Sequence, residues 1–438
     1  MFSEPESIPA EGEMFRIMSS QRYTASIRII LSVSALFGWV SPVLSESPPD
    51  LTIQSSHAGS IESLILIYSW SAEMGIVSIT DILSALPDAN TVIISQFDPA
   101  TDAFTAYQSR LAGNGLGYNR RGDPRIEFIQ DARPYGPWPR DQAIVDRSGT
   151  VWLSDSDQHG LKNVLPNIHE IFGLNTNQLD IAFAGSNLLV CGDHVIASER
   201  VGNDFLHEFS RQSVIRVPAP PEPAPFHLDL MVMPLSDSVI VVGDDMPVRD
   251  LFLAMSDEEI TKLVLQWLTE LAVSANNIKP RITGDRVAFE RTGDPALILP
   301  RLAVEKMGTI QRLMDPYVFR TAVQREPDYV WDDRIASTLS NAGIRVIRVP
   351  MWPGGILSGF QGSQSPLPVI TYPNLLVWED GIIMPVYGIP ELDDMTRTIL
   401  EDAGKRTVYP MRGGALLGFG SSGPHCLTLE VRGRPSAG

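Results

Sequence analysis

The sequence predicts an α/β protein of recurring units, each with two strands, a helix and a further strand, arranged radially rather than as one doubly wound sheet. Two observations predict this class. Paired apolar runs flank short polar turns, and segments with the apolar period of a helix follow such pairs. With 438 residues, of which 44% are hydrophobic, the chain is long enough for one large domain or two ordinary domains.

Four hairpins carry the strand prediction. Each consists of two apolar runs that flank a turn of polar residues and glycine or proline. The paired runs are 143–145 with 150–153, 188–190 with 195–197, 230–233 with 239–242, and 375–378 with 382–385.

Further elements follow the last hairpin. A helix is predicted over 391–404 and a strand over 407–409. One face of this helix is expected to hold the apolar residues Leu392, Met395, Ile399 and Leu400. The proline-rich stretch 218–225 is a stiff connector too short to mark a domain boundary, and residues 280–328 show no clear period.

Residues 1–45 predict a secretory signal peptide or an uncleaved N-terminal anchor. A short basic region ends at Arg28, and residues 29–44 are mostly apolar. This apolar run is shorter than the roughly 20 residues of a membrane-spanning helix, which favours the signal peptide. We therefore expect residues 46–438 to form a single catalytic domain that is secreted or periplasmic, with no membrane contact beyond a possible anchor.

The charge balance limits the classes of partner. The chain has 52 acidic and 34 basic residues and a net charge of −18, which argues against a nucleic-acid binder because phosphate neutralisation requires clustered Lys and Arg. An acidic surface agrees with a cationic substrate, but it is also an ordinary route to solubility. The sequence makes no prediction of oligomeric state.

Cys426 has the setting of a nucleophile. It follows the Gly/Ser-rich stretch 413–423, which leaves access for a substrate and places backbone N–H groups near the thiol. The other cysteine is Cys191, and in an oxidising compartment a Cys191–Cys426 disulfide is an alternative. A chain with this much core gains little from one bridge, so we predict two free thiols.

Two further segments combine chemically useful side chains. His227 and Asp229 stand two apart in the strand-like run 226–233, so they are expected to point to the same face. Such a pair suits an acid/base with a carboxylate beside it, whereas the alternative is a satisfied core histidine. Arg140 and Asp141 lie where a proline-rich loop enters a strand, as a structural ion pair or as part of a site.

These segments resemble the guanidino-group-modifying (pentein) superfamily, and most of all its branch of agmatine deiminases and bacterial peptidyl-arginine deiminases. Residues 138–141 match a Trp-x-Arg-Asp motif, 226–229 match the His-x-Asp segment, and 423–428 match a terminal Gly-x-His-Cys-x-Thr. Residues 372–377 and 381–388 resemble a Tyr-x-Asn strand and a Val-Pro-x-Tyr-Gly hairpin end. The resemblance implies a five-bladed, pseudo-symmetric α/β propeller of ββαβ units around a central site.

The resemblance also implies a role for each site residue. Asp141 and Asp229 would bind the guanidinium nitrogens, and Cys426 would attack the central carbon. His227 would protonate the departing ammonia and then activate water. Trp138 and Arg140 would belong to the substrate-binding residues. This chemistry requires no metal and no cofactor, and the histidines outside these motifs show no metal-ligand spacing.

In two of the motifs, neighbouring side chains are expected to point in opposite directions. If residues 425–431 are extended, His425 points away from the site that Cys426 faces. By the same reasoning Arg140 faces opposite Asp141, which favours a structural or substrate-backbone role for Arg140.

Two positions depart from the motifs of small-molecule members. Ala184 begins a stretch, 184–187, where those members carry Glu-Gly-Gly, and Gly136 stands where agmatine deiminases carry Asp. Together with export, these losses favour deimination of peptidyl-arginine to peptidyl-citrulline, so the expected partner is an arginine-containing peptide. The alternatives are agmatine or another small guanidino substrate, an amidinotransferase, and a non-catalytic exported binding module. A Cys191–Cys426 disulfide would support the last, because it would mask the nucleophile.

Overall fold

The computed structural model describes residues 51–68, 76–95, 109, 111–117, 125–130, 138–155, 173–209, 211–219, 227–274, 278–283, 286–291, 310–325, 330–354, 367–414 and 423–433. The chain divides into two compact units, Met1–Ser47 and Pro48–Gly438. Every described residue belongs to the second unit. The predicted signal peptide or anchor, Gly136 and most of the proline-rich connector lie outside the described residues, so those predictions stay untested.

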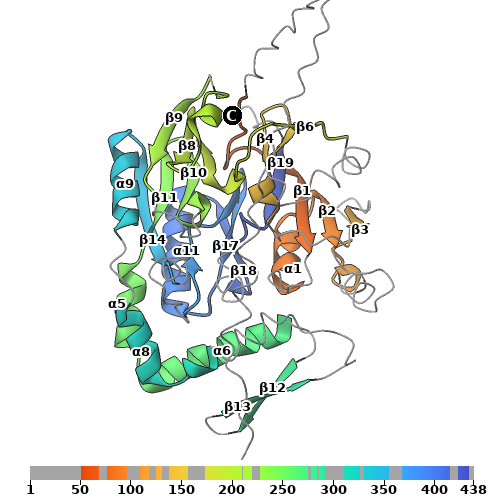
Figure 1. The fold of residues 1–438 in the computed structure, drawn as a ribbon. Helices are drawn as coiled ribbons and strands as arrows, with labels where there is room; N and C mark the ends of the chain where they lie inside the picture. The colour runs from red at the N-terminus through yellow and green to blue at the C-terminus, as the bar shows by residue number, and fades with distance from the viewer. Residues whose placement is uncertain are drawn as a thin grey trace, which may run out of the picture. The chain divides into compact units, whose positions relative to one another are not determined.

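Within these described ranges, five mixed sheets share one strand order (Figure 1). The first two strands of each are antiparallel neighbours, and the third runs parallel to the second. The five sets are β19 (Thr428–Arg432), β1 (Ile61–Tyr68), β2 (Asn90–Ser95); β4 (Ala143–Val145), β5 (Val151–Leu153), β6 (Thr176–Gln178); β7 (Leu188–Cys191), β8 (His194–Ser198), β9 (Ser213–Val217); β10 (Val232–Ser236), β11 (Val239–Asp244), β14 (Arg345–Trp352); and β16 (Leu376–Trp378), β17 (Gly381–Pro385), β18 (Thr407–Met411).

The α/β prediction and all four predicted hairpins are therefore confirmed. The antiparallel pairs are β4–β5, β7–β8, β10–β11 and β16–β17. One hairpin is displaced from its predicted bounds, because β10 begins at Val232 rather than at Leu230. The chain before it forms a 3-10 helix, η4 (Leu228–Leu230), in which the Leu230 and Met231 N–H groups donate to the His227 and Leu228 carbonyls. The predicted strand over 226–233 is therefore wrong for residues 228–230.

Two strands extend this pattern, and two others form a separate hairpin. β3 (Ile126–Gln130) runs parallel to β2, and β15 (Ile370–Thr371) is antiparallel to β14. β12 (Ile278–Thr283) and β13 (Arg286–Arg291) form a separate hairpin. This hairpin occupies part of the stretch 280–328 that the sequence left without an assignment, and it is inserted between β11 and β14.

Helices connect the strands and cover the sheets. They are α1 (Ile76–Ala85), α4 (Asn203–Leu206), α5 (Met246–Ala254), α6 (Asp257–Ser274), α8 (Pro316–Arg325), α9 (Trp331–Asn341) and α11 (Pro390–Gly404). No helix among the described residues is both long and apolar enough to cross a membrane.

The predicted helix over 391–404 is α11, which begins one residue earlier at Pro390. Proline suits the first helical turn because its missing N–H has no partner there. Leu392 and Leu400 are buried as predicted, but Met395 is 45% exposed. Thr396 takes the buried position between the two leucines, since residues four apart lie on one helical face. The prediction for Met395 is wrong.

Strand β19 has two buried faces with different chemistry. Leu429 and Val431 pack in an apolar cluster with residues of β1, β2, β4 and β5. Alternation along a strand sends Glu430 and Arg432 to the opposite face, where they form a buried ion pair at 3.0 Å. This polar face of β19 leads directly to the candidate site.

The first strand of each of the five sheets is preceded by a tight turn, which we call an approach turn. Three are 3-10 helices: η1 (Pro139–Gln142) before β4, η3 (Gly185–Asn187) before β7, and η4 before β10. The other two are turns at 372–375 before β16 and at 424–427 before β19. The predicted extended conformation of 425–431 is therefore wrong for residues 425–427.

Candidate active site

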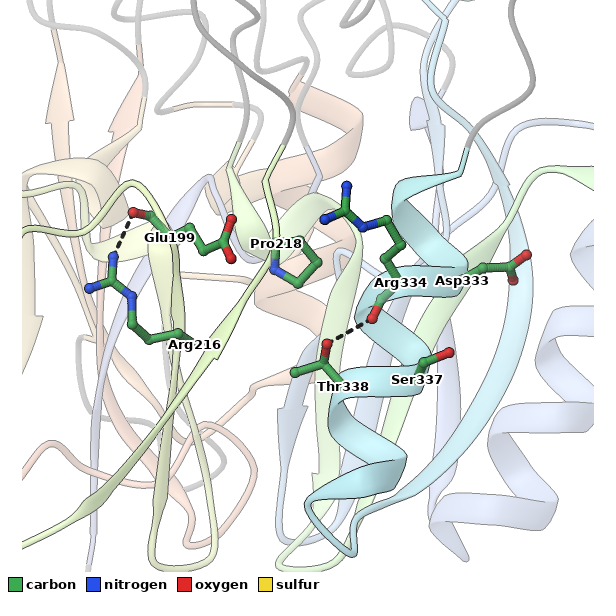
Figure 2. A pocket seen from close by; sticks show the side chains of 7 residues that line it. All are labelled: Glu199, Arg216, Pro218, Asp333, Arg334, Ser337 and Thr338. Atoms are coloured by element: carbon green, nitrogen blue, oxygen red, sulfur yellow. Dashed lines mark hydrogen bonds between the residues drawn. The ribbon is translucent and has the colours of Figure 1, made fainter.

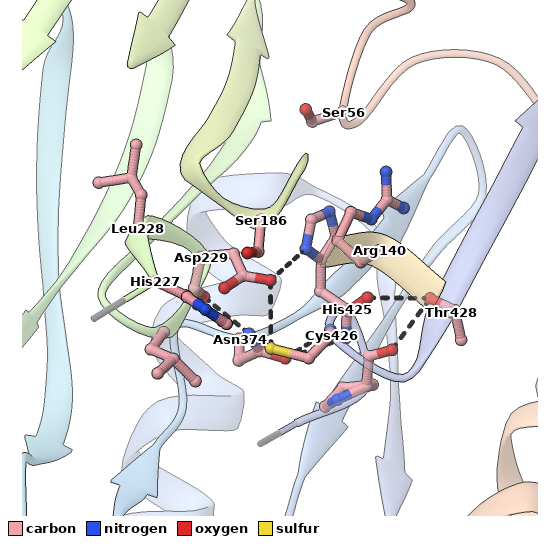
Figure 3. A network of polar contacts seen from close by, with 12 residues as sticks. Ser56, Arg140, Ser186, His227, Leu228, Asp229, Asn374, His425, Cys426 and Thr428 are labelled. Atoms are coloured by element: carbon pink, nitrogen blue, oxygen red, sulfur yellow. Dashed lines mark hydrogen bonds and ion pairs between the residues drawn. The ribbon is translucent and has the colours of Figure 1, made fainter. Parts of the chain in front are cut away.

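Some approach turns carry several polar residues, and each turn contributes one of them to a central group close to the start of its strand. These residues are Asp141, Ser186, Asp229, Asn374 and Cys426. Figure 3 shows Ser186, Asp229, Asn374 and Cys426 drawn together in one polar network. Because each comes from a different sheet, segments that are far apart in the sequence meet at one place.

Cys426 lies at the centre of this network and is 1% exposed. Its thiol donates to Asp229 Oδ2 at 3.2 Å, and Asn374 Nδ2 donates to Sγ at 3.1 Å. Burial, followed by the negative charges of Asp229 and Asp141, raises the pKa of the Cys426 thiol well above its ordinary value. The thiol of the free protein is therefore protonated near neutral pH.

Asn374 holds the turn that carries the thiol. Its Oδ1 accepts hydrogen bonds from the backbone N–H groups of His425 at 3.0 Å and Cys426 at 3.2 Å. Its Nδ2 also donates to the Asp229 carbonyl at 2.9 Å. The sequence motif included Asn374 without a role, and only its position just before a hairpin strand could have indicated one.

Asp229 is fully buried and directly contacts the thiol. Its Oδ2 also accepts from His425 Nδ1 at 2.7 Å, whereas Oδ1 has no hydrogen-bond partner among the described residues. Burial raises the pKa of this carboxyl, but the His425 hydrogen bond and the nearby His425 and His227 rings outweigh it, so the net pKa is lowered. The result is a buried, ionised carboxylate with one unpaired oxygen.

The expectation that His425 points away from the site is wrong. Residues 424–427 form a turn in which the Leu427 N–H donates to the Gly423 carbonyl and the Thr428 N–H to the His425 carbonyl. Strand alternation therefore does not apply, and the side chains of His425 and Cys426 both reach Asp229 (Figure 3).

Asp141 and His227 form the outer part of the site. His227 Nδ1 lies 3.4 Å from Asp141 Oδ1, and the Ser186 hydroxyl donates to the same oxygen. The His227 side chain is 32% exposed, in contrast to the buried Cys426. The structure thus places the four predicted catalytic residues in one neighbourhood, with His227 nearest to solvent. Their individual chemical roles stay predictions.

Gly185 allows η1 and η3 to approach closely. A Cβ at this position would lie 2.4 Å from the carbonyl oxygens of Arg140 and Ala143, so a side chain does not fit. Asn187 next to it accepts the Leu228 N–H through Oδ1 at 3.1 Å. The stretch that departs from the small-molecule motif therefore links three approach turns.

The two remaining predicted residues are directed elsewhere. Arg140 forms a buried ion pair with Glu430. Residues 139–142 form a 3-10 helix, so the strand alternation that the sequence analysis assumed for Arg140 and Asp141 does not apply. Trp138 is half-buried against two apolar clusters, and its carbonyl accepts the Asp141 N–H at 3.3 Å. Substrate binding by Trp138 stays a prediction.

Glu430 lies between two arginines beneath the site. Arg140 and Arg432 both pair with it, and all three side chains are buried. Burial raises the pKa of Glu430, but the two guanidinium charges outweigh it and lower the pKa from 4.5 to about 2. This ion pair network contributes stability that is complete above pH 4.5 and is lost as the pH falls towards about 2.

Replacing Arg140 by methionine is expected to destabilise the protein by about 3 kcal/mol at pH 7, because Glu430 keeps only one of its partners in a buried place. The measurement is urea unfolding followed by circular dichroism. Arg147→Met is the matched control, since Arg147 is an exposed partner of Asp193 at 3.9 Å and should lose less than about 1 kcal/mol. Equal losses in the two variants would contradict a stabilising role for the buried pair.

Both cysteines are free thiols, as predicted. Cys191 lies in β7 and donates to the Ser236 carbonyl at 3.2 Å. Burial and the Asp237 charge raise its pKa to about 12. Cys191 is therefore a packing residue, and Cys426 is the thiol beside acid/base groups.

Two polar features outside this network lack a nucleophile. Asp244, Asp245 and Asp332 bring their carboxylates within 4.8 Å of one another, but Arg348 pairs with Asp332 at 2.5 Å. A cavity of about 400 Å³ lies between β9 and α9 (Figure 2). It is lined by two acidic and two basic side chains with small neighbours: Glu199, Arg216, Pro218, Asp333, Arg334, Ser337 and Thr338. Neither feature includes a thiol or a histidine.

No protein-family model matches the chain, and no curated protein matches it. Solved structures match it over most of its length. The agmatine deiminase of C. jejuni aligns with 88% of this chain and 96% of its own, at a TM-score of 0.51 and 11% identity. The agmatine deiminase of Enterococcus faecalis aligns with 89% and 98%, at 0.50 and 11%.

A proposed peptidyl-arginine deiminase aligns with 87% of this chain and 99% of its own, at a TM-score of 0.52 and 11% identity. At such identities the likeness concerns the fold. The chain therefore shares the α/β fold of these solved deiminase structures.

Proposed function

We propose that the protein hydrolyses a guanidino group to a ureido group and ammonia through a covalent intermediate on Cys426. One observation carries this proposal: Asp229 is ionised, buried and adjacent to the thiol, and one of its oxygens has no partner. A buried unpaired acceptor is costly unless a donor binds to it. A guanidinium supplies planar N–H donors and a permanent positive charge, which match a carboxylate.

Substrate binding would also prepare the nucleophile. The charges of Asp229 and Asp141 help to keep the thiol protonated in the free protein. A guanidinium held between these carboxylates offsets both charges, so the thiol pKa falls and its proton passes to His227. The thiolate then adds to the central carbon to give a tetrahedral adduct. His227 returns the proton to one nitrogen, and this nitrogen leaves as ammonia.

Hydrolysis of the resulting thiouronium intermediate completes the reaction. His227, the most exposed member of the group, accepts a proton from water, and the hydroxide adds to the same carbon. Collapse of the adduct breaks the C–S bond, forms the ureido carbonyl and regenerates the thiol. The ammonia formed earlier takes up the remaining proton as ammonium. The balance is guanidinium plus water to ureido product plus ammonium, with no redox change.

The depth of the thiol limits the shape of the substrate. Cys426 is buried, whereas His227 is partly exposed, so the guanidinium has to enter past His227 on a narrow chain. The unbranched side chain of arginine has this form, and so does agmatine. We propose peptidyl-arginine as the substrate, supported by the predicted export and by Ala184, which stands where small-molecule members carry an acidic residue. Likeness in fold to agmatine deiminases makes agmatine the second candidate.

We also propose that the protein is secreted or periplasmic, and that the five sheets close around the site as propeller blades. The basic and apolar pattern of residues 1–45 supports the first proposal. The second is supported by the shared strand order and by the five approach turns that contribute to one network. Pairing of β1 with β19 also joins the first and last sheet-forming segments of the described residues.

The test compares ammonia release and ureido-product formation on three substrates under reducing conditions: an arginine peptide blocked at both ends, free arginine, and agmatine. We expect kcat/KM for the peptide to exceed that for agmatine by at least about tenfold, equivalent to 1.4 kcal/mol. Preference for agmatine would overturn the peptide assignment and retain the reaction. No product from any guanidino substrate, including when an amine acceptor is added, would overturn the reaction itself.

A further inference from the structure

His425 is the buried group whose contact with the site the sequence did not predict. Its ring is 1% exposed, and its Nδ1 lies 2.7 Å from Asp229 Oδ2. Oδ2 is also the oxygen that accepts the Cys426 thiol at 3.2 Å. One carboxylate oxygen therefore receives two donors from consecutive residues, and the other oxygen receives none among the described residues.

The surroundings of His425 favour a neutral ring with its proton on Nδ1. Burial and the positive charge of Arg140 lower the pKa of His425, whereas Asp229 and Glu430 raise it by less. An ionised Asp229 can only accept, so Nδ1 has to carry the proton in this contact. The backbone N–H of His425 donates to Asn374 Oδ1, which fixes the residue from its other side.

We propose that His425 is a positioning residue for the guanidino reaction: its Nδ1–H holds Asp229 Oδ2 beside the thiol and leaves Oδ1 directed to the substrate. The inference rests on the proposed function. His425 itself contacts neither the substrate nor the attacked carbon, and it acts through Asp229. Without this donor the carboxylate can rotate about its Cβ–Cγ bond, so the thiol and the guanidinium compete for the same two oxygens.

The test compares His425→Leu, which has no donor, with His425→Asn, whose side-chain amide can donate to Asp229. We expect kcat/KM to fall by about 10²-fold or more in the leucine variant and by no more than about tenfold in the asparagine variant. Because the His425 hydrogen bond lowers the pKa of Asp229, its loss should move the acid limb of the kcat/KM profile to higher pH in the leucine variant alone. Equal losses, or an unmoved acid limb, would overturn the positioning role.

A matched control and a second measurement separate this inference from the proposed reaction. His207 is exposed at the end of α4, so His207→Leu should change neither the rate nor the acid limb. NMR of the full-length protein with ¹⁵N-labelled histidine should show one signal, absent from His425→Asn, in the neutral Nδ1–H form without titration between about pH 5 and 9.

Failure of the His425 inference and failure of the proposed reaction give different experimental results. A titrating ring, or an Nε2–H tautomer, would overturn the inference whether or not the protein is active. The expected tautomer in a protein that turns over no guanidino compound would overturn the proposed reaction and leave the His425–Asp229 contact in place.

Discussion

Replacing Cys426 by alanine is expected to lower deimination by at least about 10⁴-fold, because no other group near the substrate carbon can form the covalent intermediate. The fold should survive, since Cys426 is a small side chain in a large apolar cluster and its truncation should cost only about 1 to 2 kcal/mol. Ammonia release and thermal unfolding of the same preparation measure the two effects.

Cys191→Ala is the matched control for this variant. Cys191 is equally buried, but its thiol bonds only to the Ser236 carbonyl in the described structure. It should lose a similar amount of stability and keep normal turnover. Full activity of Cys426→Ala would contradict the mechanism. If both variants are inactive and their circular dichroism is unchanged, loss of either buried thiol is enough to abolish activity. That result would contradict a specific catalytic role for Cys426.

Asp229→Asn is expected to lower turnover and raise thiol reactivity at the same time. Turnover should fall by roughly 10² to 10⁴-fold, because a neutral amide loses the charge that holds a guanidinium in a buried place. The thiol should react faster with iodoacetamide at pH 8, because the Asp229 charge and the acceptance of the S–H group both raise the Cys426 pKa. Initial rates of both reactions, with mass spectrometry of the labelled peptide, measure these opposite changes.

The opposite signs make this prediction specific. General misfolding would lower turnover and expose both cysteines, so labelling of Cys191 in the same sample reports on it. Asp193→Asn is the matched control, because that side chain is 96% exposed and should change neither rate. If turnover and Cys426 labelling fall together, Asp229 acts on Cys426 only by stabilising the structure around the thiol, and its charge does not raise the thiol pKa.

The parts of the fold that could be predicted depend on neighbouring residues. The β4–β5 hairpin follows from two apolar runs around Asp146, whose side chain accepts the Ser148 and Thr150 N–H groups. The α11 helix follows from its apolar period and from Pro390 at its start. The order of the motifs also indicated that Asp141, Asp229 and Cys426 belong to one site, because the segments that carry them match the motifs of one family.

The parts that could not be predicted depend on contacts between distant segments. His425 faces Asp229 because Asn374 holds the turn at 424–427, and no local pattern distinguishes that turn from an extended strand. The same holds for Arg140, whose partner Glu430 lies 290 residues further along the chain. Ser186 has no marked sequence context, and its bond to Asp141 follows from the close approach that Gly185 permits.

The pairing of β1 with β19 has a consequence for biosynthesis. While the ribosome is still adding residues before Thr428, β1 lacks its antiparallel neighbour and presents a free edge. The approach turn that carries Cys426 is also unsupported at this stage, because its following strand does not yet exist. A nascent chain therefore lacks the assembled Cys426 site. Folding has to wait for a contact between the two strands of the described structure that are farthest apart in the sequence.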